Sequence, residues 1–363
     1  MRALVCLGNK KLEVRDLPKP VIERPDHVIV KMKASGICGS DLNQFRVPAE
    51  KMKGQFYVPG HEPAGIIEEI GEAVTVVKPG DRVSIHHYEG CGKCEFCRQG
   101  YYMRCPTTKA MGMIGCQGSF ADYKLTREAN CVRLPEELSF AAGALISCGA
   151  QTTYNALRSI DISGRDDLVI FGLGSLGLCG VAIGKAMGAK VAAVGRRKDR
   201  LRIAAEYGAD SVLDVDKYRG LDGITTEDIM KKEEQREKFK TLVLAKAKEL
   251  KKVFPGGFSA AYETSGNPTV QHEMFFLLRY EGRVATIAWD ASIPTGLMVG
   301  KAITVKGSFV MPRGMCGELI HFLVERRVDL DRMVTHRFSI EESPQAFSLA
   351  DSKECGKVIV EWN

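Results

Sequence analysis

The sequence lacks the features that place a protein in or across a membrane. None of its apolar runs approaches the ~20 residues that a transmembrane helix needs. The first residues, from Met1 to Lys10, hold neither the apolar stretch nor the small-residue cleavage site of a signal peptide. The composition, 45% hydrophobic and 26% charged, is typical of a globular protein. We therefore expect no membrane partner and a cytoplasmic location.

The chain also lacks a concentrated basic segment. Its formal net charge is only +6, and the lysines between Lys231 and Lys252 are interleaved with glutamates. Mixed signs at that density are typical of a solvated helix face and not of a nucleic-acid footprint. A modest positive balance is compatible with an anionic cofactor. We expect no nucleic-acid partner.

The order of strand-like and helical segments predicts an α/β protein with two domains. Short strand-like runs separated by glycine and proline fill residues 1–150. From residue 151, strands and helices alternate, which is typical of β-α-β units around a parallel sheet. After residue 300 the mixed pattern returns and ends in a strand-like run. We expect residues 1–150 and 301–363 to form one domain and residues 151–300 to form the other.

A charged segment around residues 221–254 is longer than a β-α-β crossover needs. Thr225-x-x-Asp228 resembles a helix N-cap. Apolar residues recur near helical spacing at Phe239, Val243, Leu250 and Phe254. We interpret the segment as an inserted amphipathic surface helix, either a decoration of the crossover or a contact for a subunit or partner.

A glycine-rich motif follows the strand-like run Asp167–Phe171. It reads Gly172, Leu173, Gly174, Ser175, Leu176 and Gly177. A lone G-x-G-x-x-G is weak, but a strand before it, a helix after it and a second strand are the context of dinucleotide binding. The glycines let the backbone approach a pyrophosphate, and the helix N-terminus supplies N–H donors. We predict cofactor contacts from Gly172, Gly174, Ser175, Leu176 and Gly177.

The end of the second strand indicates which dinucleotide binds. An NAD site places Asp or Glu there to take the ribose hydroxyls. This chain instead reads Val194, Gly195, Arg196, Arg197 and Lys198. Guanidinium groups form bidentate contacts with phosphate. We therefore predict NADP in preference to NAD, with contacts from Gly195, Arg196 and Arg197.

Four of the twelve cysteines lie close together: Cys91, Cys94, Cys97 and Cys105. The C-x-x-C-x-x-C-x7-C spacing with interleaved glycines lets the thiolates converge on one ion. An iron–sulfur cluster is the alternative, but the longer last spacing favours zinc. Four sulfurs close a tetrahedral shell, so we expect a structural zinc. Six other cysteines are interpreted as buried thiols: Cys6, Cys116, Cys131, Cys179, Cys316 and Cys355.

Three more candidate ligands are spread along the first domain. They are Cys38 in G-I-C-G-S-D, His61 in G-H-E and Cys148 in S-C-G-A. The signal is weaker on spacing alone, because a single histidine is more often a core or surface residue. Two sulfurs and one nitrogen leave a coordination position for water or substrate. Asp41 is suited to hold the other imidazole nitrogen, and Ser40 is the nearest hydroxyl.

Together these residues resemble the zinc-dependent medium-chain dehydrogenase/reductase family, the alcohol and polyol dehydrogenases. The resemblance covers essentially the whole chain, including Gly60–Glu62, the four-cysteine lobe, Lys78–Val83, Gly172–Gly177 and Glu263–Pro268. It implies a GroES-like β-barrel catalytic domain, with a Rossmann doubly wound parallel-sheet domain inserted before its C-terminal part. It also implies a homo-oligomer, either a dimer or a tetramer.

The resemblance assigns a role to each candidate ligand. Cys38, His61 and Cys148 correspond to the ligands of a catalytic zinc, which makes two zinc ions per chain. Glu62 corresponds to the carboxylate that approaches this zinc from behind. Ser40 corresponds to the hydroxyl that passes on the proton of the substrate.

Other positions concern the cofactor, the proton route and the substrate. Thr152 corresponds to a residue that packs near the nicotinamide, and Lys357 to a basic contact with the pyrophosphate. Asn43 stands where several family members place a histidine, so the exit of the proton stays open. His87 occupies a pocket position that is often aromatic or apolar, and it either indicates a hydroxylated substrate or packs at the domain edge. Trp289 either walls the pocket or belongs to the core.

The resulting prediction is a zinc-dependent oxidoreductase. It interconverts an alcohol (a polyol, sugar or secondary alcohol) and a carbonyl by hydride transfer to or from NADP. Two alternatives stay open: a zinc-independent enone or quinone reductase of the same fold, and a non-catalytic zinc-bearing scaffold that binds NADP. The motifs do not encode the identity of the substrate.

Overall fold

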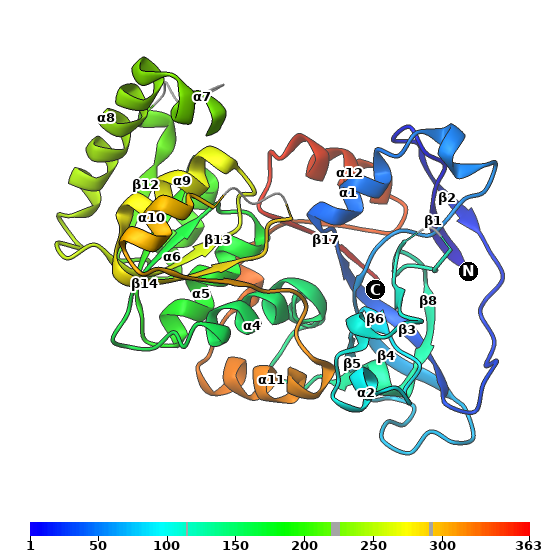
Figure 1. The fold of residues 1–363 in the computed structure, drawn as a ribbon. Helices are drawn as coiled ribbons and strands as arrows, with labels where there is room; N and C mark the ends of the chain where they lie inside the picture. Colours follow the sequence, from blue (N-terminus) through cyan, green and yellow to red (C-terminus); the bar gives the residue numbers. More distant parts are fainter. Residues whose placement is uncertain (114, 219–225, 290–292) are drawn as a thin grey trace. The chain divides into compact units, whose positions relative to one another are not determined.

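The computed structural model describes residues 1–113, 115–218, 226–289 and 293–363, and the chain divides into two units (Figure 1). Unit 1 comprises Met1–Gln151 and Val310–Asn363, and unit 2 comprises Thr152–Phe309. The chain thus returns to unit 1 at Val310, later than residue 301, because β15 (Thr304–Gly307) still pairs with the sheet of unit 2. Within the described ranges, no helix is long and apolar enough to span a bilayer.

Unit 1 is built around a seven-stranded, mostly antiparallel sheet. The strands follow the order β16-β17-β3-β4-β5-β9, and β8 also pairs with β3. Their bounds are β3 (His27–Gly36), β4 (Glu62–Ile70), β5 (Arg82–Ile85), β8 (Tyr123–Arg127), β9 (Cys131–Arg133), β16 (Val334–Phe338) and β17 (Lys357–Glu361). Two further pairs are β1 (Arg2–Cys6) with β2 (Leu12–Asp16), and β6 (Tyr88–Glu89) with β7 (Lys109–Ala110).

Short helices connect the strands of unit 1. The α-helices are α1 (Gly39–Phe45), α2 (Glu95–Arg98), α3 (Phe140–Leu145), α11 (Cys316–Glu325) and α12 (Ser343–Ser352). The 3₁₀ turns are η1 (Ala49–Met52), η2 (Tyr102–Arg104), η3 (Glu128–Asn130), η6 (Arg313–Met315) and η7 (Leu330–Met333). A π turn, η4 (Ile146–Ala150), joins α3 to α4 (Gln151–Ser159).

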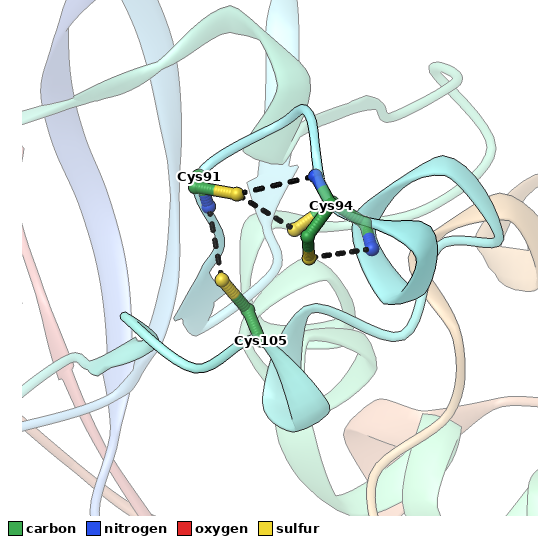
Figure 2. A group of neighbouring side chains, drawn as sticks. Cys91, Cys94 and Cys105 are labelled. Atoms are coloured by element: carbon green, nitrogen blue, oxygen red, sulfur yellow. Dashed lines mark hydrogen bonds between the residues drawn. The ribbon is translucent and has the colours of Figure 1, made fainter.

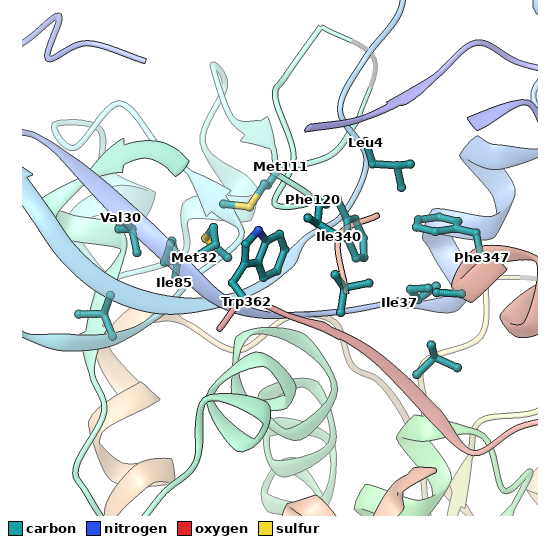
Figure 3. Packing of buried hydrophobic residues seen from close by; sticks show 14 of the residues in the cluster. Leu4, Val30, Met32, Ile37, Ile85, Met111, Phe120, Ile340, Phe347 and Trp362 are labelled. Atoms are coloured by element: carbon teal, nitrogen blue, oxygen red, sulfur yellow. The ribbon is translucent and has the colours of Figure 1, made fainter. Parts of the chain in front are cut away.

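The apolar core of unit 1 holds β3 in place (Figure 3). Val30 and Met32 lie in one cluster, two positions apart, as the two-residue period of a strand requires. Phe120 and Phe347 meet edge to face in the same cluster, with ring centroids 5.1 Å apart. Because β3 is fixed along its length, the segment that follows its last residue has a defined position.

Unit 2 is a parallel six-stranded sheet in the order β12-β11-β10-β13-β14-β15. This is the doubly wound order, and the direction of winding reverses between β10 and β13. The strands are β10 (Asp167–Phe171), β11 (Lys190–Gly195), β12 (Ser211–Asp214), β13 (Phe258–Glu263), β14 (Leu278–Thr286) and β15. The other elements are α5 (Ser175–Ala186), α6 (Lys198–Glu206), η5 (Val215–Tyr218), α7 (Thr226–Lys231), α8 (Glu233–Leu250), α9 (Pro268–Leu277) and α10 (Thr295–Gly300).

The charged segment forms a helix where the sequence predicts one. Helix α8 buries Phe239, Val243 and Leu250 and exposes most of its lysines and glutamates. It also buries Lys246, whose Nζ lies 2.6 Å from Oε2 of Glu273 in α9. The predicted N-cap, Thr225, lies outside the described residues.

Candidate metal centres and cofactor site

The four cysteines of the predicted structural site converge in one lobe of unit 1 (Figure 2). Their sulfur atoms all lie within 4.8 Å of one another. The N–H of Cys91 donates to Cys105 Sγ at 3.3 Å, and the N–H of Cys94 donates to Cys91 Sγ at 3.4 Å. The N–H of Cys97 donates to Cys94 Sγ at 3.5 Å. Donors aimed at sulfur favour the thiolate, which is the form that binds metal.

The spacing of these sulfurs fits a tetrahedral ion. With Zn–S distances of about 2.3 Å, sulfurs at tetrahedral corners lie about 3.8 Å apart, and Cys91 Sγ lies 4.0 Å from Cys97 Sγ. Burial raises the pKa of Cys97 to about 12. Burial opposes ionisation of Cys105 as well, but hydrogen bonds from Thr107 and the Cys91 N–H lower its pKa to about 6. The lobe therefore fits a closed four-sulfur site.

A second group of possible ligands gathers Cys38, His61, Glu62 and Cys148. One ligand atom from each lies within 4.8 Å of all the others. Cys38 follows β3 and His61 precedes β4, while Cys148 comes from the π turn η4. Strands β3 and β4 are antiparallel, with Gly36 opposite Glu62. The end of one strand and the start of the other therefore bring Cys38 and His61 together.

The carboxylate of Asp41 fixes two of these residues at once. Its Oδ1 lies 2.8 Å from His61 Nδ1, and its Oδ2 accepts the N–H of Cys38 at 2.9 Å. The aspartate is buried, and its hold on Nδ1 leaves His61 Nε2 as the ligand atom. Ser40 Oγ lies 3.4 Å from His61 Nε2. The sequence-based pairing of Asp41 with His61 is thus present in the structure.

Electrostatics within this group favour a cation. A hydrogen bond with Cys148 and the charge of His61 hold the pKa of Cys38 well below its usual range. The same hydrogen bond, with burial, raises the pKa of Cys148. Burial opposes a charged His61, but Asp41 and Cys38 raise its pKa well above the usual value. These directions fit a site for a metal ion, which binds to deprotonated thiols and a neutral imidazole.

Lys357 pairs with Glu62 inside unit 1. Both side chains are 1% exposed, the Nζ of Lys357 contacts Oε2 of Glu62, and it donates to the Ile37 carbonyl at 2.9 Å. Gly36 makes room for the pair, since a Cβ there would lie 2.0 Å from Glu62 Oε2. Burial raises the pKa of Glu62 to about 7 against the attraction of Lys357. The amine predicted to contact the cofactor's pyrophosphate therefore pairs with a buried carboxylate within unit 1, and its contact with the cofactor stays a prediction.

The remaining predicted residues fall in both units. In unit 1, His87 is 6% exposed with its ring centroid 5.2 Å from that of His61, and Asn43 is exposed on α1. In unit 2, Thr152 is buried in α4, whereas Trp289 is 85% exposed and touches Phe309 edge to face at 5.5 Å. Trp289 is therefore no core residue, and its place in the pocket stays a prediction.

The glycine motif lies where the winding of the sheet reverses. Gly172 has φ of 89°, and a Cβ at Gly177 would lie 1.8 Å from the Gly172 carbonyl oxygen. A Cβ at Gly174, the N-cap of α5, would meet no described atom within 4 Å. Ser175 Oγ is sealed from solvent with no hydrogen-bond partner in the described part of the chain. This open approach and unpaired hydroxyl fit an anionic group at a helix N-terminus.

The end of β11 carries the residues that bear on cofactor choice. Arg196 is exposed, and its Nε lies 3.7 Å from Asp216 Oδ1. Arg197 has φ of 75° and its Nε lies 3.5 Å from Asp199 Oδ1. The last residue of the strand is Gly195, so two guanidinium groups occupy the positions directly beyond it.

Sequence reasoning missed the surroundings of Cys148. Gln151 is fully buried, and its Nε2 donates to the Ser147 carbonyl. The hydroxyl of Ser147 donates to the His61 carbonyl at 3.1 Å. A polar glutamine in an otherwise apolar helical run was the available signal.

Two family models match the chain. The alcohol dehydrogenase GroES-like domain matches residues 24–136, and the zinc-binding dehydrogenase model matches residues 175–325. The first match contains Cys38, His61 and the four-cysteine lobe. The second begins at Ser175, within the glycine motif. Both predicted domain types are thereby confirmed.

Known proteins resemble the chain over its full length. An uncharacterized zinc-type alcohol dehydrogenase-like protein, YphC of Escherichia coli, is 30% identical, covering 100% of this chain and 99% of the relative. An L-threonine 3-dehydrogenase of Shewanella baltica is 28% identical, covering 100% of both. The structure of an alcohol dehydrogenase from Thermus sp. ATN1 superposes with a TM-score of 0.84 at 24% identity, covering 99% of both chains.

Proposed function

Because the chain belongs to the zinc-dependent medium-chain dehydrogenase/reductase family, we propose that it interconverts an alcohol and a carbonyl with NADP and two zinc ions. In the forward direction the alcohol loses a hydride to NADP⁺ and a proton to solvent, giving the carbonyl compound and NADPH. The substrate classes we propose are polyols, sugars and secondary alcohols. The L-threonine 3-dehydrogenase relative carries the name of a secondary alcohol substrate.

The open-site ligands we propose are Cys38, His61 and Cys148, which share one small volume in unit 1. When bound there, zinc supplies a Lewis acid that polarises the C–O bond of the substrate, and NADP accepts the hydride. Asp41 holds His61 and Cys38 in the geometry that binds metal. Lys357 contacts the carboxylate of Glu62, one oxygen of which lies within 4.8 Å of the other three ligand atoms.

The proton of the substrate leaves through Ser40. Its Oγ lies 3.4 Å from His61 Nε2, next to the position of the proposed metal, so this hydroxyl can accept one proton while releasing its own. The next exposed polar side chain on α1, Asn43, has no titratable group. Water therefore receives the proton beyond Ser40.

The preference for NADP rests on Arg196 and Arg197. Both follow a strand whose last residue is Gly195 and not a carboxylate. Nε of Arg197 already lies 3.5 Å from Asp199 Oδ1, so the support for a phosphate ligand is the pair of guanidinium groups directly beyond Gly195. Thr152 and Trp289 are proposed to line the nicotinamide and substrate ends.

The observation that carries this proposal is the convergence of two thiols and one imidazole around Asp41. The test is a panel of alcohols assayed with NADP and NAD in parallel, on enzyme of measured zinc content. We expect two zinc ions per chain, turnover of at least one alcohol, and a higher kcat/KM with NADP. Faster turnover with NAD refutes the role of Arg196 and Arg197.

The two alternatives give other outcomes in the same panel. Reduction of an enone by zinc-free protein supports the reductase. The convergence of Cys38, His61 and Cys148 argues against it, because a zinc-independent reductase needs no metal ligands. NADP binding without turnover of any alcohol supports the scaffold. The homo-oligomeric state and the cytoplasmic location stay predictions.

A further inference from the structure

Two adjacent histidines of unit 1 differ in the partners of their ring nitrogens. Nε2 of His86 lies 3.1 Å from the Met311 carbonyl oxygen, and its Nδ1 lies 3.1 Å from the Tyr88 carbonyl oxygen and 3.3 Å from the Tyr88 nitrogen. Both nitrogens of His86 therefore have partners in the protein. Burial lowers its pKa to about 4, which keeps this ring neutral.

In the ring of His87, a carbonyl oxygen fixes the nitrogen that carries the proton. Its Nδ1 lies 2.6 Å from the carbonyl oxygen of Ser147, and a carbonyl only accepts, so Nδ1 carries the proton. Ser147 belongs to the π turn that also carries Cys148. A π turn departs from the regular helical hydrogen-bond pattern, and the Ser147 carbonyl accepts from Gln151 Nε2 as well. The turn thus fixes both the position and the tautomer of His87.

The opposite nitrogen of His87, Nε2, is left with a lone pair. No described residue donates to it, and it is not among the polar atoms that are sealed from solvent. The ring as a whole is 6% exposed, so the small accessible part includes Nε2. The centroid of the ring lies 5.2 Å from that of His61. An oriented acceptor therefore stands beside the group of candidate metal ligands.

We propose that Nε2 of His87 accepts a hydrogen bond from a second hydroxyl of the substrate, next to the hydroxyl that is oxidised. This inference rests on the proposed function and narrows its substrate class to vicinal diols and polyols. An apolar alcohol that displaces water from Nε2 leaves this acceptor unpaired, and sites built to bind a hydroxyl reject analogues that lack it. One such contact discriminates by about tenfold to a hundredfold.

The test compares substrates that differ by one hydroxyl: propane-1,2-diol with propan-2-ol, and butane-2,3-diol with butan-2-ol. Dissociation constants are measured by calorimetry on the zinc-loaded chain with its preferred nicotinamide nucleotide, and kcat/KM is measured for the same pairs. We expect the wild type to prefer each diol by about tenfold or more. In His87→Phe, which keeps a ring but removes the acceptor, the two members of each pair should bind equally.

Two variants separate this role from a structural one. His87→Gln places an amide oxygen near the position of Nε2 and should restore part of the preference for the diol. His86→Gln keeps a donor for the Met311 carbonyl and should leave the preference unchanged, although it changes the neighbouring ring. Melting temperatures establish that all three variants are folded.

The outcomes distinguish this inference from the proposed function. A wild type that binds diol and monohydric alcohol equally, or binds neither, overturns the inference, as does a preference that survives His87→Phe. Turnover of alcohols without a preference for diols overturns this inference alone. Binding of diols that depends on His87, without turnover by any nucleotide, supports it and contradicts the proposed reaction.

Discussion

From the buried ion pair between α8 and α9 we can predict how much Lys246 contributes to the free energy of unfolding of unit 2. The side chains of Lys246 and Glu273 are 5% and 2% exposed, and their charged atoms lie 2.6 Å apart. Lys246→Met keeps an aliphatic stem but leaves the carboxyl of Glu273 without a cation. Oε1 of Glu273 already lacks a hydrogen-bond partner among the described residues. Because breaking a buried pair costs about 3–5 kcal/mol, we expect unfolding of unit 2 to become easier by that amount near pH 8.

The loss of stability caused by Lys246→Met depends on pH, because Glu273 can take up a proton. Burial raises the pKa of Glu273 even while Lys246 attracts its charge. The folded chain therefore binds this proton more tightly than the unfolded chain, and stability from this group is lost as pH rises through the folded pKa. Without Lys246 the folded pKa moves higher still. We expect Lys246→Met to be less destabilising near pH 5 than near pH 8.

Urea unfolding, with amide exchange followed in α8 and α9, measures unit 2 separately from unit 1. Lys248→Met is the matched control, since Lys248 is exposed on the same helix and its loss should cost less than about 0.5 kcal/mol. Replacing both charges, as in Lys246→Met with Glu273→Leu, should recover most of the stability. A loss below about 1 kcal/mol for Lys246→Met near pH 8, or no recovery in the double variant, refutes the reasoning.

Three further predictions concern the sites. Cys38→Ser should abolish activity and remove one zinc with little change in melting temperature, whereas Cys94→Ser should lower the melting temperature. Metal analysis and calorimetry compare the two variants. If they behave alike, the division into a catalytic and a structural zinc site is wrong. Gly177→Ala places a Cβ 1.8 Å from the Gly172 carbonyl oxygen, so nucleotide affinity should fall about tenfold or more at unchanged zinc content, measured by fluorescence titration. Asp41→Asn weakens the hold on His61 and Cys38 and should reduce zinc affinity about 10–100-fold in a chelator competition, where unchanged affinity would argue against the positioning role.

Structural features that depend on residue type and local spacing were predictable from the sequence. The run Asp167–Phe171 with its glycines is both strand and turn in the structure, because apolar β-branched residues and glycine have strong local preferences. The four-cysteine lobe was predictable for the same reason, since its ligands lie close in the chain. Strand β14 shows the limit: it begins at Leu278, and its pairing with β13 shifts register between Leu278 and Arg283, where Glu281 has φ of 58°.

Features that depend on partners distant in the chain were not predictable. The contact of Lys357 with Glu62 requires the register of β17 on β3 and of β3 on β4. The tautomer of His87 is set by the carbonyl of Ser147, which no local pattern indicates. Sequence reasoning therefore found the candidate ligands and the contact of Asp41 with His61, but not the other contacts around them.

The π turn at Ile146–Ala150 has a consequence for how this enzyme can change. One irregular helical turn presents both Cys148 and the carbonyl that orients His87. A deletion that restored a regular α-helix would rotate the two together, so that the proposed metal ligand and the proposed substrate contact would be lost in a single event. Substitutions at position 87 leave the turn intact. New substrate specificity can therefore arise from substitutions between β5 and β6, where His87 lies, while the helical turn that carries Cys148 stays unchanged.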